Sequence, residues 1–82
     1  MTSDSEIRKT ISGLIARERE LRAQLAAGEI DSSTERAELA AAETELDQCW
    51  DLLRQRAAAR EFGADPDQAQ VRPASVVEGY RG

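Results

Sequence analysis

The chain has 82 residues and a formal net charge of −5, and 40% of its residues are hydrophobic. Many of these are alanine, so a single domain of this size builds only a thin core, and we expect help from self-association. The sequence has no histidine and one cysteine, Cys49, which excludes an intrachain disulfide and a Ser-His-Asp triad. We therefore expect no enzyme, and neither a metal nor a cofactor.

The order of apolar and charged residues also bears on where the protein works. No segment approaches the roughly 20 apolar residues that a transmembrane helix needs, and the opening residues MTSD are polar and acidic, unlike a signal peptide. The negative charge and the lack of alternating basic and aromatic residues argue against direct binding of nucleic acid. We expect a cytoplasmic protein that binds neither membrane nor nucleic acid.

Helix signals open the chain. Ser3 or Asp4 can cap the first free amides, and Gly28 follows the last residue of the apolar pattern, as a C-terminal glycine does. Gly13 weakens such a helix by about 1 kcal/mol relative to alanine without ending it. We predict a first helix over about residues 4–27 and a turn over 28–31.

A longer helix is predicted after the turn. Asp31 or Ser32 can begin it, and the spacing of Ser32 and Glu35 matches a capping box. No glycine or proline interrupts the chain until Gly63, so we predict a helix over about 32–62, roughly 45 Å long. Residues 1–63 then form one unit, and residues 64–82 form a C-terminal arm.

The apolar residues of the two predicted helices mirror each other. From Ile7 with Leu53 to Leu21 with Leu39, the positions of each facing pair add up to 60. Two helices with one apolar spacing and opposite chain directions pack as an antiparallel hairpin. The predicted fold is therefore all-α, a long coiled-coil-like two-helix hairpin with an extended arm, which we expect to dimerise into a four-helix bundle.

The two flanks of this hairpin differ. On one flank Arg17 is predicted to face Glu45 across a wet edge. On the other, Ile15 and Trp50 widen the apolar stripe beyond what one hairpin can cover, so we expect a homo-oligomer or a protein partner. The predicted interface residues are Ile15, Trp50, Leu52, Val76, Val77 and Tyr80.

Two charged residues interrupt the predicted apolar seam. Arg56 falls in the last layer opposite Asp4, where the hairpin frays and a long side chain can reach water. Glu18 has room to extend toward Arg22, one turn further on, and a polar contact that sets the register of a dimer is the alternative. Catalysis by Glu18 lacks both a partner group and a pocket.

Cys49 carries the one thiol of the chain, and its spacing puts it on the seam against Ile11. A free cysteine in such a place packs as a small apolar residue. The neighbouring Asp47 and Asp51 are expected to raise the pKa of this thiol, and no histidine can activate it. We therefore predict a packing role for Cys49 and not a reactive one.

Acidic residues gather around the predicted turn. Positions 26–47 hold seven acidic residues against Arg36 alone, and Glu43, Asp47 and Asp51 repeat like charges every four residues. A solvated end that keeps the protein in solution is one interpretation, and a docking surface for a basic partner or a metal is the other. We define the acidic tip as Glu29, Asp31, Glu35, Glu38, Glu43 and Glu45.

The arm after Gly63 differs in composition from the helices. Asp65 and Pro66 predict a capped single turn, and the step from Arg72 to Pro73 predicts extended chain. Its apolar side chains could fold back over the bare flank, cross to a second protomer or serve as a linear recognition motif. We expect ordered packing, with apolar contacts from Val71, Val76, Val77 and Tyr80.

The most distinctive strings of the sequence are LRAQLAAGEI at 21–30, LDQCWDLLRQR at 46–56 and ADPDQAQVRPASVVEGY at 64–80. On these strings, which reach along nearly the whole chain, the protein resembles a small actinobacterial family catalogued as domain of unknown function 2630. The resemblance implies an actinobacterial cytoplasmic protein in which Gln48, Trp50 and the Arg-Pro step of the arm belong to a shared pattern. It carries over no activity, catalytic residue or cofactor.

These expectations converge on a non-enzymatic module for protein–protein interaction or self-assembly. Ile15 and Trp50 serve as its apolar anchors, and the arm provides a second contact. The alternative is a small regulatory factor that presents the acidic tip to a large basic machine such as RNA polymerase or the ribosome.

Overall fold

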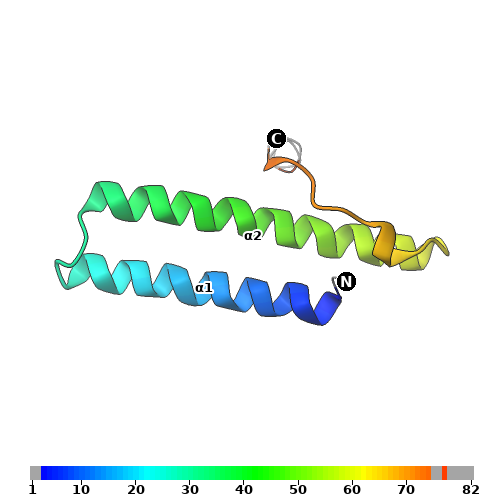
Figure 1. The fold of residues 1–82 in the computed structure, drawn as a ribbon, viewed down its shortest axis with the longest axis horizontal. Helices are drawn as coiled ribbons and strands as arrows, with labels where there is room; N and C mark the ends of the chain where they lie inside the picture. The colour runs from blue at the N-terminus through cyan, green and yellow to red at the C-terminus, as the bar shows by residue number, and fades with distance from the viewer. Residues whose placement is uncertain (1–2, 75–76, 78–82) are drawn as a thin grey trace.

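The computed structural model describes residues 3–74 and residue 77, and in it two long helices lie side by side in opposite directions (Figure 1). Helix α1 spans Asp4–Ala26, helix α2 spans Ser32–Glu61, and a short 3-10 helix, η1, spans Pro66–Gln68. The fold is the predicted all-α hairpin with a C-terminal arm. Among the described residues, no helix is long and apolar enough to cross a membrane.

Local capping sets both ends of α1. The Ser3 hydroxyl accepts a hydrogen bond from the Glu6 amide at 3.1 Å, which satisfies one of the free N–H groups of the first turn. At the other end Gly28 has φ 75°, and the Glu29 amide donates to the Gln24 carbonyl at 2.8 Å. Glycine enters this left-handed region without strain, so the helix ends here, one residue before its predicted end.

Helix α2 begins with a cap that differs from the predicted capping box. The Asp31 carboxylate, and not the Ser32 hydroxyl, accepts a hydrogen bond from the Thr34 amide at 2.7 Å. A charged acceptor suits the free amides and the dipole of a helix N-terminus, and this bond lowers the pKa of Asp31. At the far end Gly63, also with φ 75°, follows the helix, as the sequence predicts.

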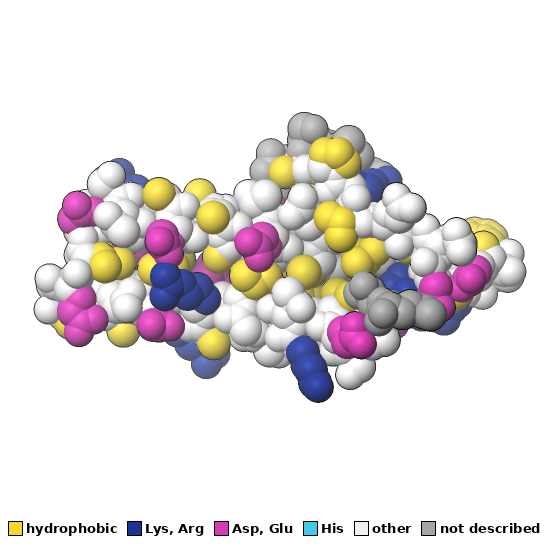
Figure 2. Space-filling view, in the orientation of Figure 1, with side chains coloured by type: hydrophobic (Ala, Val, Ile, Leu, Met, Phe, Trp, Pro, Cys, Tyr) yellow, Lys and Arg dark blue, Asp and Glu magenta, His cyan; other side chains and the backbone are white. Residues whose placement is uncertain are grey.

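Apolar residues fill the space between the two helices. Near the turn Leu21 and Ala42 are buried. In the open half of the hairpin a buried cluster of three residues is surrounded by partly buried ones: Ile7, Ile11 and Leu52, then Leu46, Cys49, Leu53 and Ala69. On the face drawn in Figure 2, apolar side chains follow the line between the helices. The core is thin, in keeping with the small share of large apolar residues.

The position of Leu52 corrects both the predicted seam and the predicted interface. The apolar spacing predicts Leu53 on the seam, but Leu52 is the more deeply buried of the two. Ala69 of the arm packs against the cluster that contains Leu52, so the arm closes this side of the hairpin. Leu52 is therefore a core residue of its own chain and is covered before any partner binds.

The arm returns along α2 of its own chain after η1 (Figure 1). Val77 is only 4% exposed, and its amide donates to the Pro73 carbonyl at 3.2 Å. The arm thus packs in an ordered way over its described part, although Val71 is exposed and does not anchor it. Val76 and Tyr80, which are predicted interface residues, lie outside the described residues.

Candidate protein-interaction surface

A buried carboxylate on the outer face of α2 holds the arm. Asp51 is only 2% exposed, and Arg72 of the arm approaches its Oδ2 with Nε at 3.2 Å. Gln55, one turn further along α2, donates to the same oxygen at 2.9 Å and to the Gln70 carbonyl at 2.7 Å. A buried charge needs a counter-charge and hydrogen bonds, so the arm and the Asp51 carboxylate depend on each other.

This contact corrects the predicted row of repelling carboxylates. The sequence places Asp51 in a row with Glu43 and Asp47, where like charges destabilise the helix unless cations face them, and the arm supplies such a cation to Asp51. The Gln48 amide adds a hydrogen bond to the Arg72 carbonyl at 3.2 Å. Sequence reasoning missed this contact because the course of the arm is not encoded in helix periodicity. The family resemblance did point to Gln48 and to the Arg-Pro step.

Arg56 ties three segments together at the open end of the hairpin. Its Nε donates to Asp4 Oδ1 at 2.5 Å, and its Nη1 donates to the Pro66 carbonyl and to Asp67 Oδ1, both at 3.1 Å. Arg60 donates to the other oxygen of Asp4 at 2.8 Å. The predicted facing of Asp4 and Arg56 is confirmed, but Arg56 is buried and not frayed into water, because η1 covers it. Arg56 and then Arg60 lower the pKa of Asp4 to about 2.

A half-open cavity of about 550 Å³ lies between the arm and α2. Trp50 and Val77 give it apolar walls, and charged residues of both signs surround them, among them Asp51 and Arg54. The hollow adjoins Trp50, which is an exposed large hydrophobic residue. In the part of the chain that the structure describes, no group of three or more His, Cys, Asp or Glu residues is placed to hold a metal ion.

Ion pairs close one edge of the hairpin near the turn. Arg17 Nη2 lies 2.6 Å from Glu38 Oε2, and its Nη1 lies 3.6 Å from Glu20 Oε1. These two carboxylates draw the guanidinium toward the turn, so the predicted pairing of Arg17 with Glu45 is wrong. Glu18, on the seam, lies 3.8 Å from Arg22, which confirms the predicted contact along the helix.

The opposite edge carries the predicted apolar flank. In the sequence, Arg17 and Glu38 each come directly before a residue of the helix–helix seam. Ile15 and Trp50 each come directly after one. Successive helix residues point in different directions around the axis, so the two pairs lie on opposite edges of the hairpin. Ile15 is 39% exposed and Trp50 is 47% exposed. The described part of the arm covers the side with Leu52 through Ala69, and its Val77 shares a cavity with Trp50, whose side chain stays accessible.

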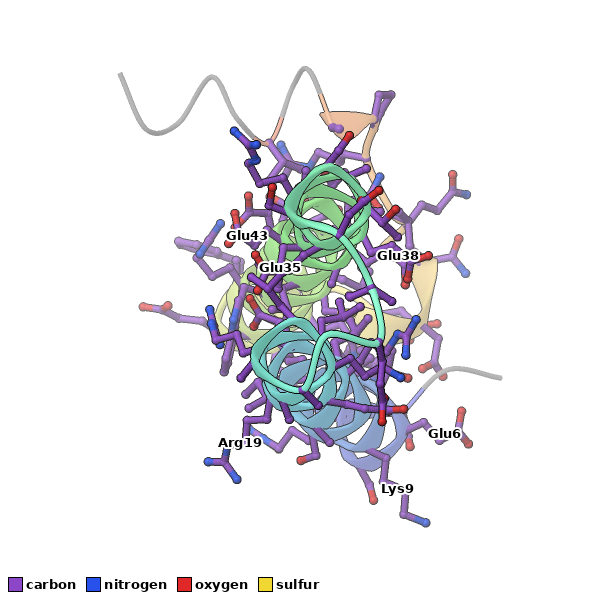
Figure 3. The ribbon with its side chains drawn as sticks, turned by 90° about the vertical axis from the view of Figure 1, so that its left-hand side faces the viewer. Glu6, Lys9, Arg19, Glu35, Glu38 and Glu43 are labelled. Atoms are coloured by element: carbon purple, nitrogen blue, oxygen red, sulfur yellow. The ribbon has the colours of Figure 1, made fainter. Side chains whose placement is uncertain are left out.

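The acidic tip does not form one continuous surface. Seen from the turn end, Glu38 and Glu43 lie on opposite sides of the hairpin (Figure 3). Glu38 is paired with Arg17, and Asp31 serves as the N-cap of α2. The other members are partly or fully exposed: Glu29, Glu35, Glu43 and Glu45. A partner at the turn therefore meets separate carboxylates on different sides.

Cys49 packs where the sequence places it, against the cluster that contains Ile11. Burial and then the nearby charge of Glu45 raise the pKa of its thiol. The rise in the pKa of the Cys49 thiol agrees with the prediction. The predicted cause was wrong, because the charge that raises this pKa belongs to Glu45 and not to Asp47 or Asp51. A thiol that is held protonated and half-buried is a weak nucleophile.

The chain matches the model of one protein family over residues 3–82, and that family is described as a protein of unknown function (DUF2630). Uncharacterized protein Mb0922c of Mycobacterium bovis and Uncharacterized protein Rv0898c of Mycobacterium tuberculosis are each 56% identical to it over 80 residues. The alignment covers 98% of this chain and 92% of each relative. No solved structure matches the chain. Because the match includes both the hairpin and the arm, the chain belongs as a whole to the DUF2630 family.

Proposed function

We propose that the protein is a non-enzymatic interaction module that works by self-association in the cytoplasm. The observation that carries this proposal is the accessible pair of Ile15 and Trp50 on the edge opposite to the ion pair of Arg17 and Glu38. An aromatic side chain of this size buries about 150–250 Å² when it is covered. A cytoplasmic location accords with a single thiol that has no partner for an intrachain disulfide.

The thin core supports the same proposal. The buried apolar residues of the described part are Ile7, Ile11, Leu21, Ala42, Leu52 and Val77. A single core in a chain of this length supplies only about 3–5 kcal/mol. A second hairpin on the edge with Ile15 and Trp50 adds apolar burial that two helices and an arm lack.

The acidic tip gives less support to the regulatory alternative. Two of its members are already engaged within the chain, Glu38 by Arg17 and Asp31 by the Thr34 amide. Glu38 and Glu43 also lie on opposite sides of the hairpin (Figure 3). A basic partner therefore has no single acidic face to bind, and self-association is the function that we propose.

The mass of the protein in solution tests this proposal. Size-exclusion chromatography with light scattering should give twice the 9.0 kDa of one chain at micromolar concentration. Trp50→Ala should shift the mass toward one chain while helix content by circular dichroism is kept. Phe62→Ala is the matched control, because Phe62 is 81% exposed at the end of α2, and it should leave the mass unchanged. A wild-type mass of one chain at high micromolar concentration would contradict self-association.

A further inference from the structure

Six residues make up the edge of the hairpin opposite to the ion pair of Arg17 and Glu38. Each is exposed and follows directly after a residue of the helix–helix interface, as Ile15 follows Leu14. Each also comes one helical turn, four positions, after a second interface residue, so all six lie on the same side of the interface. Figure 3 shows Glu43 on the side of the hairpin away from Glu38. We call this set the open edge: Arg8, Ile15 and Arg22 from α1, with Glu43, Trp50 and Ala57 from α2.

The open edge has a symmetric arrangement of apolar and charged groups. The contact between Asp4 and Arg56 fixes the register of the two helices. A residue of α2 lies at the level of the α1 residue whose number, added to its own, gives 60. Trp50 is then about 7.5 Å along the hairpin from Ile15, and Glu43 is about 13.5 Å from Arg8, at 1.5 Å per residue. Both pairs are centred on the same level, between positions 12 and 13.

A two-fold axis at that level, perpendicular to the helices, sets each residue of a pair at the level of the other residue in the second copy. It brings Ile15 of one copy toward Trp50 of the second copy, and Arg8 toward Glu43, with the two hairpins in opposite directions. Among the described residues, neither Arg8 nor Glu43 has an ion-pair partner within the chain. Each edge therefore presents an apolar centre between unpaired charges of opposite sign.

Charge selects this orientation over the parallel one. If the two hairpins ran in the same direction, their turn ends would meet, and positions 26–47 of each copy hold seven acidic residues against Arg36 alone. In the opposite direction, the acidic half of each copy lies beside the open end of the other, where Arg8 and Arg54 are exposed.

We propose that the open edge binds a second copy of this chain, antiparallel, about a two-fold axis at the level between positions 12 and 13. This proposal rests on the self-association proposed above and adds to it the orientation and the contacts. Ile15 and Trp50 form the apolar centre of the dimer, and two symmetric ion pairs of Arg8 with Glu43 flank it.

Charge reversal tests the contacts. Arg8→Glu and Glu43→Arg each oppose like charges at two places in the dimer, so each should raise the dimer dissociation constant about tenfold or more in sedimentation equilibrium. The double variant should restore a value near that of the wild type. Lys9→Glu makes the same charge change next to Arg8 on a side chain that points away from α2 (Figure 3), and it should leave the constant nearly unchanged.

A distance measurement tests the orientation. In a Cys49→Ala background, a spin label at Glu29→Cys reports the separation of the two turns in the full-length dimer. The antiparallel dimer places them about 50 Å apart, whereas a parallel dimer places them within about 20 Å.

The two sets of results separate the two proposals. A dimer whose turns lie about 20 Å apart would overturn the antiparallel arrangement. So would a dimer whose dissociation constant is unchanged by both single charge reversals. Either result would leave self-association standing. A wild-type chain that stays monomeric would overturn both. Weakening by each single variant, recovery in the double variant and a separation near 50 Å together support the antiparallel dimer.

Discussion

Arg56 and Asp4 stand 52 positions apart in the chain, yet the guanidinium Nε lies 2.5 Å from the carboxylate Oδ1. The pair joins the first turn of α1 to α2, and Asp67 connects the same guanidinium to the arm. Arg60 binds the second oxygen of Asp4. The folded state at the open end therefore contains Asp4 in its ionised form.

This geometry predicts a loss of stability in acid. The pKa of Asp4 falls from an ordinary 3.8 to about 2 in the folded chain. A carboxyl with a lowered folded pKa stabilises the fold above its unfolded pKa, and this contribution disappears as the pH falls from about 4 through about 2. Thermal melts followed by circular dichroism should show a smaller loss over this window for Asp4→Asn than for the wild type. An equal loss in the two proteins would contradict the assignment.

The Asp51 carboxylate should control how firmly the arm is held. Asp51→Ala removes the carboxylate that Arg72 and Gln55 both contact, and we expect a loss of about 1–3 kcal/mol in the free energy of unfolding. The amide of Val77 should then exchange faster with solvent in native-state hydrogen exchange. Glu61→Ala, which removes an exposed acid from the same helix, is the control and should change neither quantity. Unchanged Val77 protection in Asp51→Ala would show that the arm is held by other contacts.

Two glycines should respond in opposite ways to alanine. A Cβ at Gly13 meets no atom within 4 Å, and the residue lies inside α1, so Gly13→Ala should stabilise the protein by about 0.5–1 kcal/mol. Gly28 has φ 75°, so Gly28→Ala should cost about 1–2 kcal/mol. Urea unfolding at one protein concentration measures both changes. A stabilising Gly28→Ala would contradict the left-handed end of α1.

Cys49 should react slowly in the native protein. Burial and Glu45 raise the pKa of its thiol, so maleimide labelling should be much slower than in the urea-unfolded chain. Cys49→Ser should destabilise the fold more than Cys49→Ala, because a hydroxyl in this apolar position needs a hydrogen bond. Labelling at the unfolded rate would place the thiol at the surface.

Sequence alone determined the helices, their ends and their pairing. Ser3, Gly28 and Gly63 act within a few residues of their own positions, so the chain discloses them without any knowledge of the fold. The matched apolar spacing needs only the geometry of a helix, and it placed Asp4 opposite Arg56. The accessible flank with Ile15 and Trp50 follows from the same geometry, and both side chains are exposed in the structure.

Tertiary structure decided which polar groups are buried, because that depends on where the arm lies. The arm covers Asp51 and brings Arg72 to it, and η1 covers Arg56. Helix spacing alone puts Asp51 in a row of like charges and lets Arg56 reach water from the last layer of the seam. Ala69 likewise packs against the cluster of Leu52 and makes it a core residue. Helix periodicity describes one element at a time, whereas a buried charge is stable only when a segment distant in sequence supplies its counter-charge and hydrogen bonds.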